Sequence, residues 1–128
     1  MKNNASPANL LRWFDPRFRS LSTWGFILNR VTALGLTLYL CMHLVVLGNL
    51  AQGQQAYDSF IALAETPLVK TGEMLVIAAG LIHGLNGIRV GLTSFGVGVR
   101  SQRIILIVLM ILALAGIAVF AAKMFLGV

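Results

Sequence analysis

The sequence predicts an all-α membrane protein of three transmembrane helices. Hydrophobic residues make up 58% of its 128 residues, and charged residues only 11%. A soluble domain of this size needs more charge to cover its surface, so the composition indicates a bilayer environment. Three apolar segments, 24–50, 68–92 and 104–126, each exceed the ~20 residues that a helix needs to cross a bilayer. Hydrocarbon offers backbone groups no outside partners, so each span is expected to be helical.

The positions of lysine and arginine predict the orientation. Eight of the ten lie before or early in the first span, or around the connection between the second and third: Lys2, Arg12, Arg17, Arg19, Arg30, Arg89, Arg100 and Arg103. Only Lys70 and Lys123 fall on the other side. The positive-inside rule then predicts a multi-pass protein of the cell's inner (cytoplasmic) membrane with a cytoplasmic N-terminus. The membrane surface accounts for the net charge of +6, so no nucleic-acid partner is expected.

The remaining segments connect the spans within a single domain, 1–128. Segment 8–23 mixes aromatic residues with arginines, which is typical of an interfacial segment and unlike a signal peptide. The outer connection carries apolar residues at helical spacing and is expected to form a short surface helix. Thr66 and Pro67 read as an N-cap and the first residue of the second span. The tight, glycine-containing inner connection predicts that the second and third spans are antiparallel neighbours.

The only two histidines, His43 and His83, both fall inside predicted spans. A titratable ring in hydrocarbon is costly and usually faces a partner, a cavity or a metal. Imidazole is also the usual axial ligand of haem iron. A hydrogen bond to a neighbouring helix is the alternative for either residue, and a quinone contact is a further alternative for His43.

Glycines recur around the second histidine at spacings of four, three and four residues: Gly80, Gly84, Gly87 and Gly91. Such a stripe allows close packing of two helices. Gly87 also lies one turn from His83, where the absence of a side chain would leave room for a flat macrocycle. The two interpretations can hold at different points of the stripe, and Gly80, Gly84 and Gly87 are the candidate haem-packing positions.

Two arginines, Arg30 and Arg89, lie near the inner ends of the first two spans. Interfacial arginines commonly extend their side chains toward lipid headgroups. The functional alternative is contact with a haem propionate or a quinone oxygen. Asn29, Arg30 and Thr32 together form a small polar cluster suited to lining a headgroup pocket.

Two stretches resemble motifs of the cytochrome b membrane-anchor subunits of succinate dehydrogenase (respiratory complex II). Residues Phe26–Ala33 resemble the signature Ser-x-x-His-Arg-x-Ser/Thr-Gly, and His83-x-x-x-Gly87-x-Arg89 resembles the haem-ligand motif His-x-x-x-Gly-x-Arg-His. The length, the three spans and the expected topology agree with this family. The chain departs from the family's serine, two histidines and a later aspartate at four positions: Phe26, Asn29, Val90 and Ser94.

The resemblance implies an oxidoreductase subunit without a dicarboxylate site of its own. A flavoprotein subunit would oxidise succinate, an iron–sulfur subunit would pass electrons to quinone near Arg30, and a second anchor subunit would complete the bundle. His83 carries over as a haem ligand, and Arg30, Asn29, Arg89 and Thr32 as quinone or propionate contacts. Two-haem members often use menaquinone, which favours that quinone. The alternatives are a fumarate reductase anchor, or a haem-free structural subunit of another membrane complex.

Depth along the helices bears on the number of haems. With Arg30 and Arg89 marking the inner interface, His43 lies ~20 Å deep and His83 ~9 Å. The two ligands of one iron should lie at similar depth, so the two histidines do not suit one iron. The hypothesis is two stacked b haems, with His83 on the inner and His43 on the outer one, each completed by a partner's histidine. A single haem on His83 is the alternative.

Overall fold

The computed structural model describes residues 20–127, which form helices and connecting turns without any strand. Three helices are long and apolar enough to cross a membrane: α2 (Leu21–Leu50), α4 (Pro67–Ser94) and α5 (Gln102–Leu126). Two shorter elements connect them: α3 (Gln54–Ala64) and the 3-10 turn η2 (Val99–Ser101). The predicted all-α architecture with three membrane-spanning helices is confirmed.

Helix α2 begins three residues before the predicted span because Ser20 provides an N-cap. The Ser20 Oγ accepts a hydrogen bond from the Thr23 backbone N–H at 3.3 Å, which satisfies one of the otherwise unpaired donors of the first turn. Residues 21–23 of the predicted interfacial segment therefore belong to α2. Residues 8–19 of that segment lie outside the described part of the chain.

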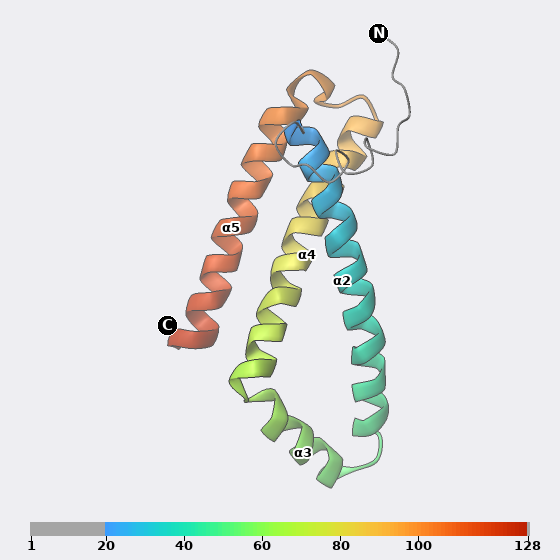
Figure 1. Cartoon of the computed structure of the whole chain (residues 1–128), viewed down its shortest axis with the longest axis vertical. Helices are drawn as coiled ribbons and strands as arrows, with labels where there is room; N and C mark the ends of the chain where they lie inside the picture. Colours follow the sequence, from blue (N-terminus) through green and yellow to red (C-terminus); the bar gives the residue numbers. More distant parts are fainter. Residues whose placement is uncertain (1–19, 128) are drawn as a thin grey trace, which may run out of the picture.

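The outer connection contains the predicted short helix, α3. It joins the far ends of α2 and α4 (Figure 1). Helix α4 begins at Pro67 with Thr66 at the N-cap position, as the sequence predicts. The Thr66 hydroxyl, however, donates to the Leu63 carbonyl at 2.6 Å and makes no capping bond to α4. Thr66 therefore holds the end of α3 against the start of α4.

Helices α4 and α5 are antiparallel neighbours, as the tight connection between them predicts (Figure 1). Gly98 sits in this connection with a φ of 70°, a left-handed conformation that favours glycine, and any Cβ there would collide with Ile105. Small residues let the two helices approach. Ala113 is buried, and a Cβ on Gly116 would lie 3.0 Å from a methyl group of Leu81.

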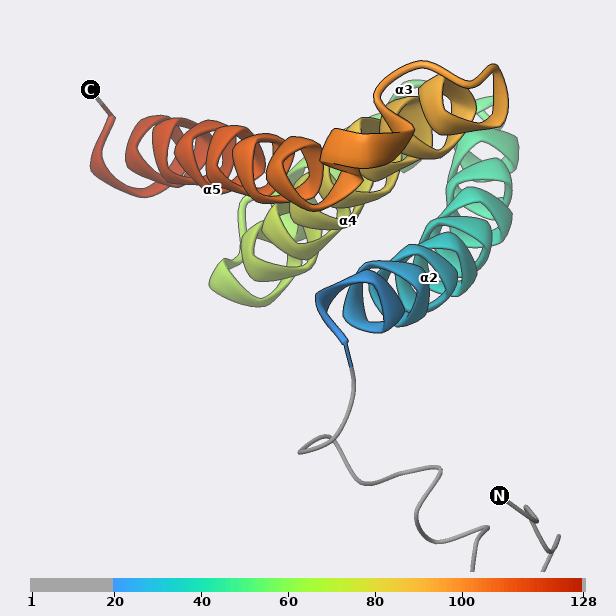
Figure 2. The same cartoon turned by 90° about the horizontal axis from the view of Figure 1, so that it is seen from above.

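Helix α4 lies between α2 and α5 (Figures 1 and 2). Helices α2 and α4 approach each other where α2 begins and separate toward α3. The buried positions are few and largely small or polar: Gly25, Thr32, Asn86, Arg89, Leu106 and Ala113. Most large apolar side chains are exposed. Polar groups inside and apolar groups outside is the arrangement expected of a helix bundle in hydrocarbon.

Gly25 of α2 lies close to side chains of both other membrane-spanning helices. A Cβ there would lie 3.1 Å and 3.3 Å from the Leu106 methyl groups and 3.6 Å from Arg89 Nη2. Gly25→Leu should therefore destabilise the detergent-solubilised protein by about 1–3 kcal/mol through overpacking. The matched control is Gly35→Leu, because a Cβ on Gly35 meets no atom within 4 Å. Thermal melting followed by circular dichroism checks this, and equal melting of the two variants would contradict it.

Candidate functional site

A polar cluster fills the junction of α2 and α4, where the two helices are closest. Helix α2 contributes three positions at spacings of four and three residues: Gly25, Asn29 and Thr32. Helix α4 contributes three polar side chains at a spacing of three residues: His83, Asn86 and Arg89. Residues three or four apart lie on one face of a helix, so both sets face each other across a single interface.

The hydrogen bonds of His83 determine which of its ring nitrogens carries the proton. Its Nδ1 lies 3.0 Å from the Asn29 backbone oxygen and 3.4 Å from Thr32 Oγ1. A carbonyl oxygen only accepts, so Nδ1 must donate, and a neutral ring then keeps its lone pair on Nε2. Within residues 20–127, Nε2 makes no hydrogen bond. His83 is therefore held by one nitrogen and has the other available as a ligand.

Thr32 supports this arrangement. Its hydroxyl lies 2.7 Å from the Leu28 carbonyl, to which it donates, and its oxygen is left to accept from His83. The residue is buried at the junction. In this structure Thr32 positions the imidazole, and it does not line an open headgroup pocket.

The glycine stripe of α4 faces open space in the described part of the chain. A Cβ built on Gly80, Gly84, Gly87 or Gly91 would meet no atom within 4 Å. The stripe therefore does not pack α4 against α2 or α5. The close packing of α4 and α5 is instead achieved through small residues of α5. An open strip of backbone beside His83 can accept a flat group or a helix from another chain.

Asn29 carries a buried acceptor with no partner. Its Oδ1 is inaccessible and makes no hydrogen bond to any residue that the structure describes. Buried polar atoms are nearly always satisfied, and an orphaned one is a sign of an additional ligand or water. The atom lies in the same residue whose backbone oxygen holds His83. The junction thus combines an available imidazole nitrogen with an available polar atom, both of which suit an additional ligand.

Asn86 and Arg89 form a buried network that the sequence analysis did not predict as a unit. Asn86 Nδ2 donates to the Gly25 carbonyl at 2.9 Å, and Arg89 Nε donates to Asn86 Oδ1 at 2.9 Å. Asn86 is 1% exposed and Arg89 6%. Arg89 forms no ion pair with an acidic residue in the described chain, which leaves a buried guanidinium whose Nη groups can meet an outside anion. The spacing of three residues from His83 to Asn86 to Arg89 was the available sequence signal.

Arg30 does not join the cluster. Its guanidinium lies over the Phe26 ring, 4.5 Å from the ring centroid, and the residue is exposed. Consecutive residues of a helix point ~100° apart, and in this structure Arg30 and Asn29 face different neighbours. The polar group expected from Asn29, Arg30 and Thr32 is therefore divided between two faces of α2.

His43 lies eleven residues beyond Thr32, the last residue of α2 that hydrogen-bonds to α4 in the described chain. It is exposed, its ring stacks on Tyr39 with centroids 5.4 Å apart, and its Nδ1 lies 3.5 Å from the Tyr39 hydroxyl. A hydroxyl can donate or accept, so this contact leaves the tautomer of His43 open. Tyr39 was not predicted as a site residue, although its spacing of four residues from His43 is a usable signal.

The two histidines lie farther apart along the membrane axis than the sequence predicts. His83 contacts Asn29 and Thr32, and His43 lies 14 and 11 residues beyond them, ~17–21 Å along α2. The expected difference of ~10 Å assumed that Arg30 and Arg89 mark one level. Arg89 instead lies beside Gly25, so that assumption was wrong.

Comparison with known proteins places the chain in a family. A sequence profile described as succinate dehydrogenase/fumarate reductase transmembrane subunit matches residues 4–122. The chain is 32% identical over 102 residues to the succinate dehydrogenase 2 membrane subunit of Mycobacterium tuberculosis, with 75% of each chain covered. It is 32% identical over 96 residues to the succinate dehydrogenase hydrophobic membrane anchor subunit of Halobacterium salinarum, covering 74% of this chain and 72% of the relative. With three membrane-spanning helices around a polar junction, the chain belongs to the transmembrane subunits of succinate dehydrogenase and fumarate reductase.

Proposed function

We propose that this chain is the haem b-binding membrane anchor of a succinate dehydrogenase and helps to pass electrons from an iron–sulfur subunit to a membrane quinone. The observation that carries the proposal is the 3.0 Å hydrogen bond from His83 Nδ1 to the Asn29 carbonyl. Histidines that bind metals usually donate their other ring N–H to such an acceptor, which fixes the ring and the tautomer. A b-type haem bound there would supply one-electron transfer.

The surroundings of His83 fit a flat, partly anionic group. Gly80, Gly84 and Gly87 present backbone without side chains, and a Cβ at each of them would meet no atom within 4 Å. The buried guanidinium of Arg89 is held through Nε by Asn86 and offers its Nη groups to a propionate. A partner anchor subunit would have to provide the second ligand, because the chain's other histidine, His43, lies ~17–21 Å farther along α2.

The proposed quinone contacts are Asn29 and Arg30. The unpartnered Asn29 Oδ1 suits the hydroxyl of a quinol, because it needs a donor. Arg30 is exposed on the adjacent face of α2 and would have to leave the Phe26 ring to reach the same headgroup. Menaquinone is the favoured quinone. Thr32 acts in this proposal through His83, as a positioning residue.

His43 is the proposed ligand of a second haem. His43 lies ~17–21 Å from the level of His83 along α2, compared with the ~10 Å expected from the sequence. The larger separation makes it harder for both histidines to bind one iron. The exposure of His43 on the diverging part of α2 leaves the imidazole accessible from outside the chain. A histidine of the partner anchor subunit would complete this site as well.

The setting of the proposed complex follows from charge. Arg89 lies beside Gly25 near the start of α2, Arg100 lies in η2 and Arg103 in the first turn of α5. Lys70 lies in the first turn of α4 and Lys123 in the last turn of α5, which is the other end of this antiparallel pair. The positive-inside rule makes the arginine-rich end cytoplasmic in the cell's inner membrane. The iron–sulfur and flavoprotein subunits would dock on that end.

The amount of haem b per covalent flavin in the purified complex tests this function. A pyridine haemochrome assay gives the content, and a redox titration of the same sample separates the centres by potential. Two haems with distinct potentials support both histidine assignments. A single haem would support His83 as its ligand and would assign His43 to helix packing or to a quinone contact. No haem overturns the haem-binding function.

His43→Ala should remove one haem and spare the other. The residue makes no contact with the His83 junction, so the second centre and the assembly of the complex should remain. The measurement is again haem per flavin, with Asn49→Ala as a control for an exposed polar position of the same helix. Loss of both haems, or of neither, in an assembled complex would contradict the two-level arrangement.

A fumarate reductase anchor of the same architecture is the second candidate, because the family's description covers both enzymes. Both relatives named above are succinate dehydrogenase subunits, which favours succinate oxidation as the physiological direction.

A further inference from the structure

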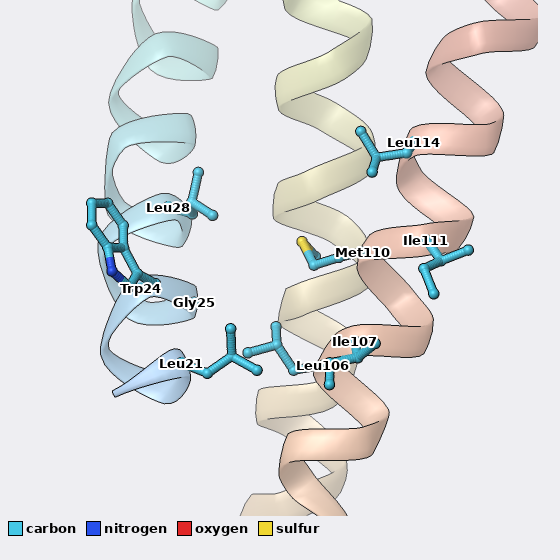
Figure 3. Close-up of a pocket in the computed structure, with 9 residues that line it drawn as sticks. All are labelled: Leu21, Trp24, Gly25, Leu28, Leu106, Ile107, Met110, Ile111 and Leu114. Carbon is cyan, nitrogen blue, oxygen red and sulfur yellow. The ribbon is translucent and has the colours of Figure 1, made fainter. Parts of the chain in front are cut away.

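An apolar groove runs between α2 and α5 at the end of the bundle where α2 begins (Figure 3). It has a volume of about 200 Å³. Leu21 and Leu28 form one wall, and Ile107, Met110 and Leu114 form the other. The side chains of Leu28 and Met110 point into the space between the helices. Gly25, at the edge of the junction that holds His83, also lines the groove, whereas His83 does not.

The groove is apolar along its length. Its α5 wall runs from Leu106 to Leu114, ~12 Å at 1.5 Å per residue. The side chains that line it are those of leucine, isoleucine, methionine and tryptophan. A hydrocarbon chain matches this lining in polarity.

A cation, Arg103, precedes the α5 wall of the groove by less than one helical turn. Arg103 precedes Ile107 by four residues and Met110 by seven, so it continues the α5 face that lines the groove. Arg103 is exposed and has no ion-pair partner in the described chain. Trp24 from α2 stands at the same end, and tryptophan is typical of the headgroup level of a bilayer.

We propose that this groove binds an anionic phospholipid. One acyl chain lies between α2 and α5, and the phosphate contacts Arg103. Basic residues at the cytoplasmic ends of helix pairs attract anionic headgroups, and an arginine contact to a phosphate is charge-assisted. The proposal does not depend on haem, because none of the residues that line the groove belongs to the proposed haem or quinone contacts.

Native mass spectrometry of the complex tests the site. The complex is released from phosphatidylcholine nanodiscs that contain a minor fraction of phosphatidylglycerol, and the retained phosphatidylglycerol is counted. Arg103→Gln should reduce its occupancy about fivefold, the factor for one cationic contact at a membrane surface. The matched control is Arg100→Gln, an exposed arginine that lies in η2 and therefore off the α5 face that lines the groove.

A second pair of variants tests the acyl-chain position. Leu28→Trp fills the groove and should abolish the tightly retained lipid, while Leu34→Trp, on the same helix but outside the groove, should have no effect. Equal losses in Arg103→Gln and Arg100→Gln would overturn the proposal in favour of general surface attraction. Retention of phosphatidylglycerol by Leu28→Trp would also overturn it. So would a wild-type complex that retains no lipid, the result expected if a partner subunit fills the groove.

Discussion

His83→Ala is expected to remove the haem proposed at the α2–α4 junction, lowering its occupancy more than tenfold. The physical reason is that the Nδ1 of His83 is held 3.0 Å from the Asn29 carbonyl oxygen, which leaves its Nε2 available to bind iron. Loss of an axial ligand removes far more affinity than loss of an outer-shell partner, which alone costs 10–100-fold. The measurement is haem b per flavin, together with the low-spin haem signal in electron paramagnetic resonance.

Thr32→Val is the matched variant for this prediction. It removes the longer of the two contacts to Nδ1, at 3.4 Å, and leaves the Asn29 carbonyl in place. The haem should be retained with a shifted midpoint potential, because the ligand stays but its support changes. Full haem content with an unchanged low-spin signal in assembled His83→Ala complex would contradict the assignment.

The sequence was sufficient for the fold because each helix carries its own signals. Apolar length defines the three spans, Pro67 starts α4, and the glycine-containing connection makes α4 and α5 antiparallel neighbours. The start of α2 was missed by three residues because hydropathy outweighed the N-cap at Ser20. Helix boundaries of this kind depend on one side-chain hydrogen bond, which a hydropathy window does not register.

The site was only partly predictable, because rotation and offset of packed helices are properties of the interface. His83 stands out as a polar ring in an apolar segment. Nothing in the one-dimensional pattern, however, states that Asn29 faces α4 while Arg30 faces away. Likewise, counting residues from Arg30 and Arg89 gave the wrong difference in depth between His43 and His83. The reason is that α4 is displaced along α2, so that Arg89 lies beside Gly25 and not beside Arg30.

The Asn86–Arg89 network explains why the helices adopt that offset. Asn86 is the largest fully buried side chain, and its two hydrogen bonds join the Gly25 carbonyl of α2 to the guanidinium of Arg89. The Asn86–Arg89 bond lies within α4, but a shift of α4 by one residue would break the bond from Asn86 to the Gly25 carbonyl of α2. The network therefore fixes the register that brings His83 opposite Asn29.

Asn86→Leu should consequently destabilise the protein by about 2–3 kcal/mol, the cost of leaving a buried charged group without its hydrogen bond. Leucine has the branched shape of asparagine but is bulkier, so the contribution of packing has to be separated from that of the hydrogen bonds by a second substitution. Thermal melting of the purified complex is the measurement, and Asn49→Leu, at an exposed position of α2, is the control.

The double variant Asn86→Leu, Arg89→Leu separates the network from local packing. With the guanidinium removed, no buried charge is left unsatisfied, and more than half of the lost stability should return. If the cost of Asn86→Leu came from altered packing, the second substitution would add to the loss. Recovery in the double variant would establish that the cost of Asn86→Leu comes from a buried cation left without its hydrogen bond. A loss of stability in the double variant equal to or greater than in Asn86→Leu would contradict this origin of the cost and leave the register to apolar packing around Gly25 and Leu106.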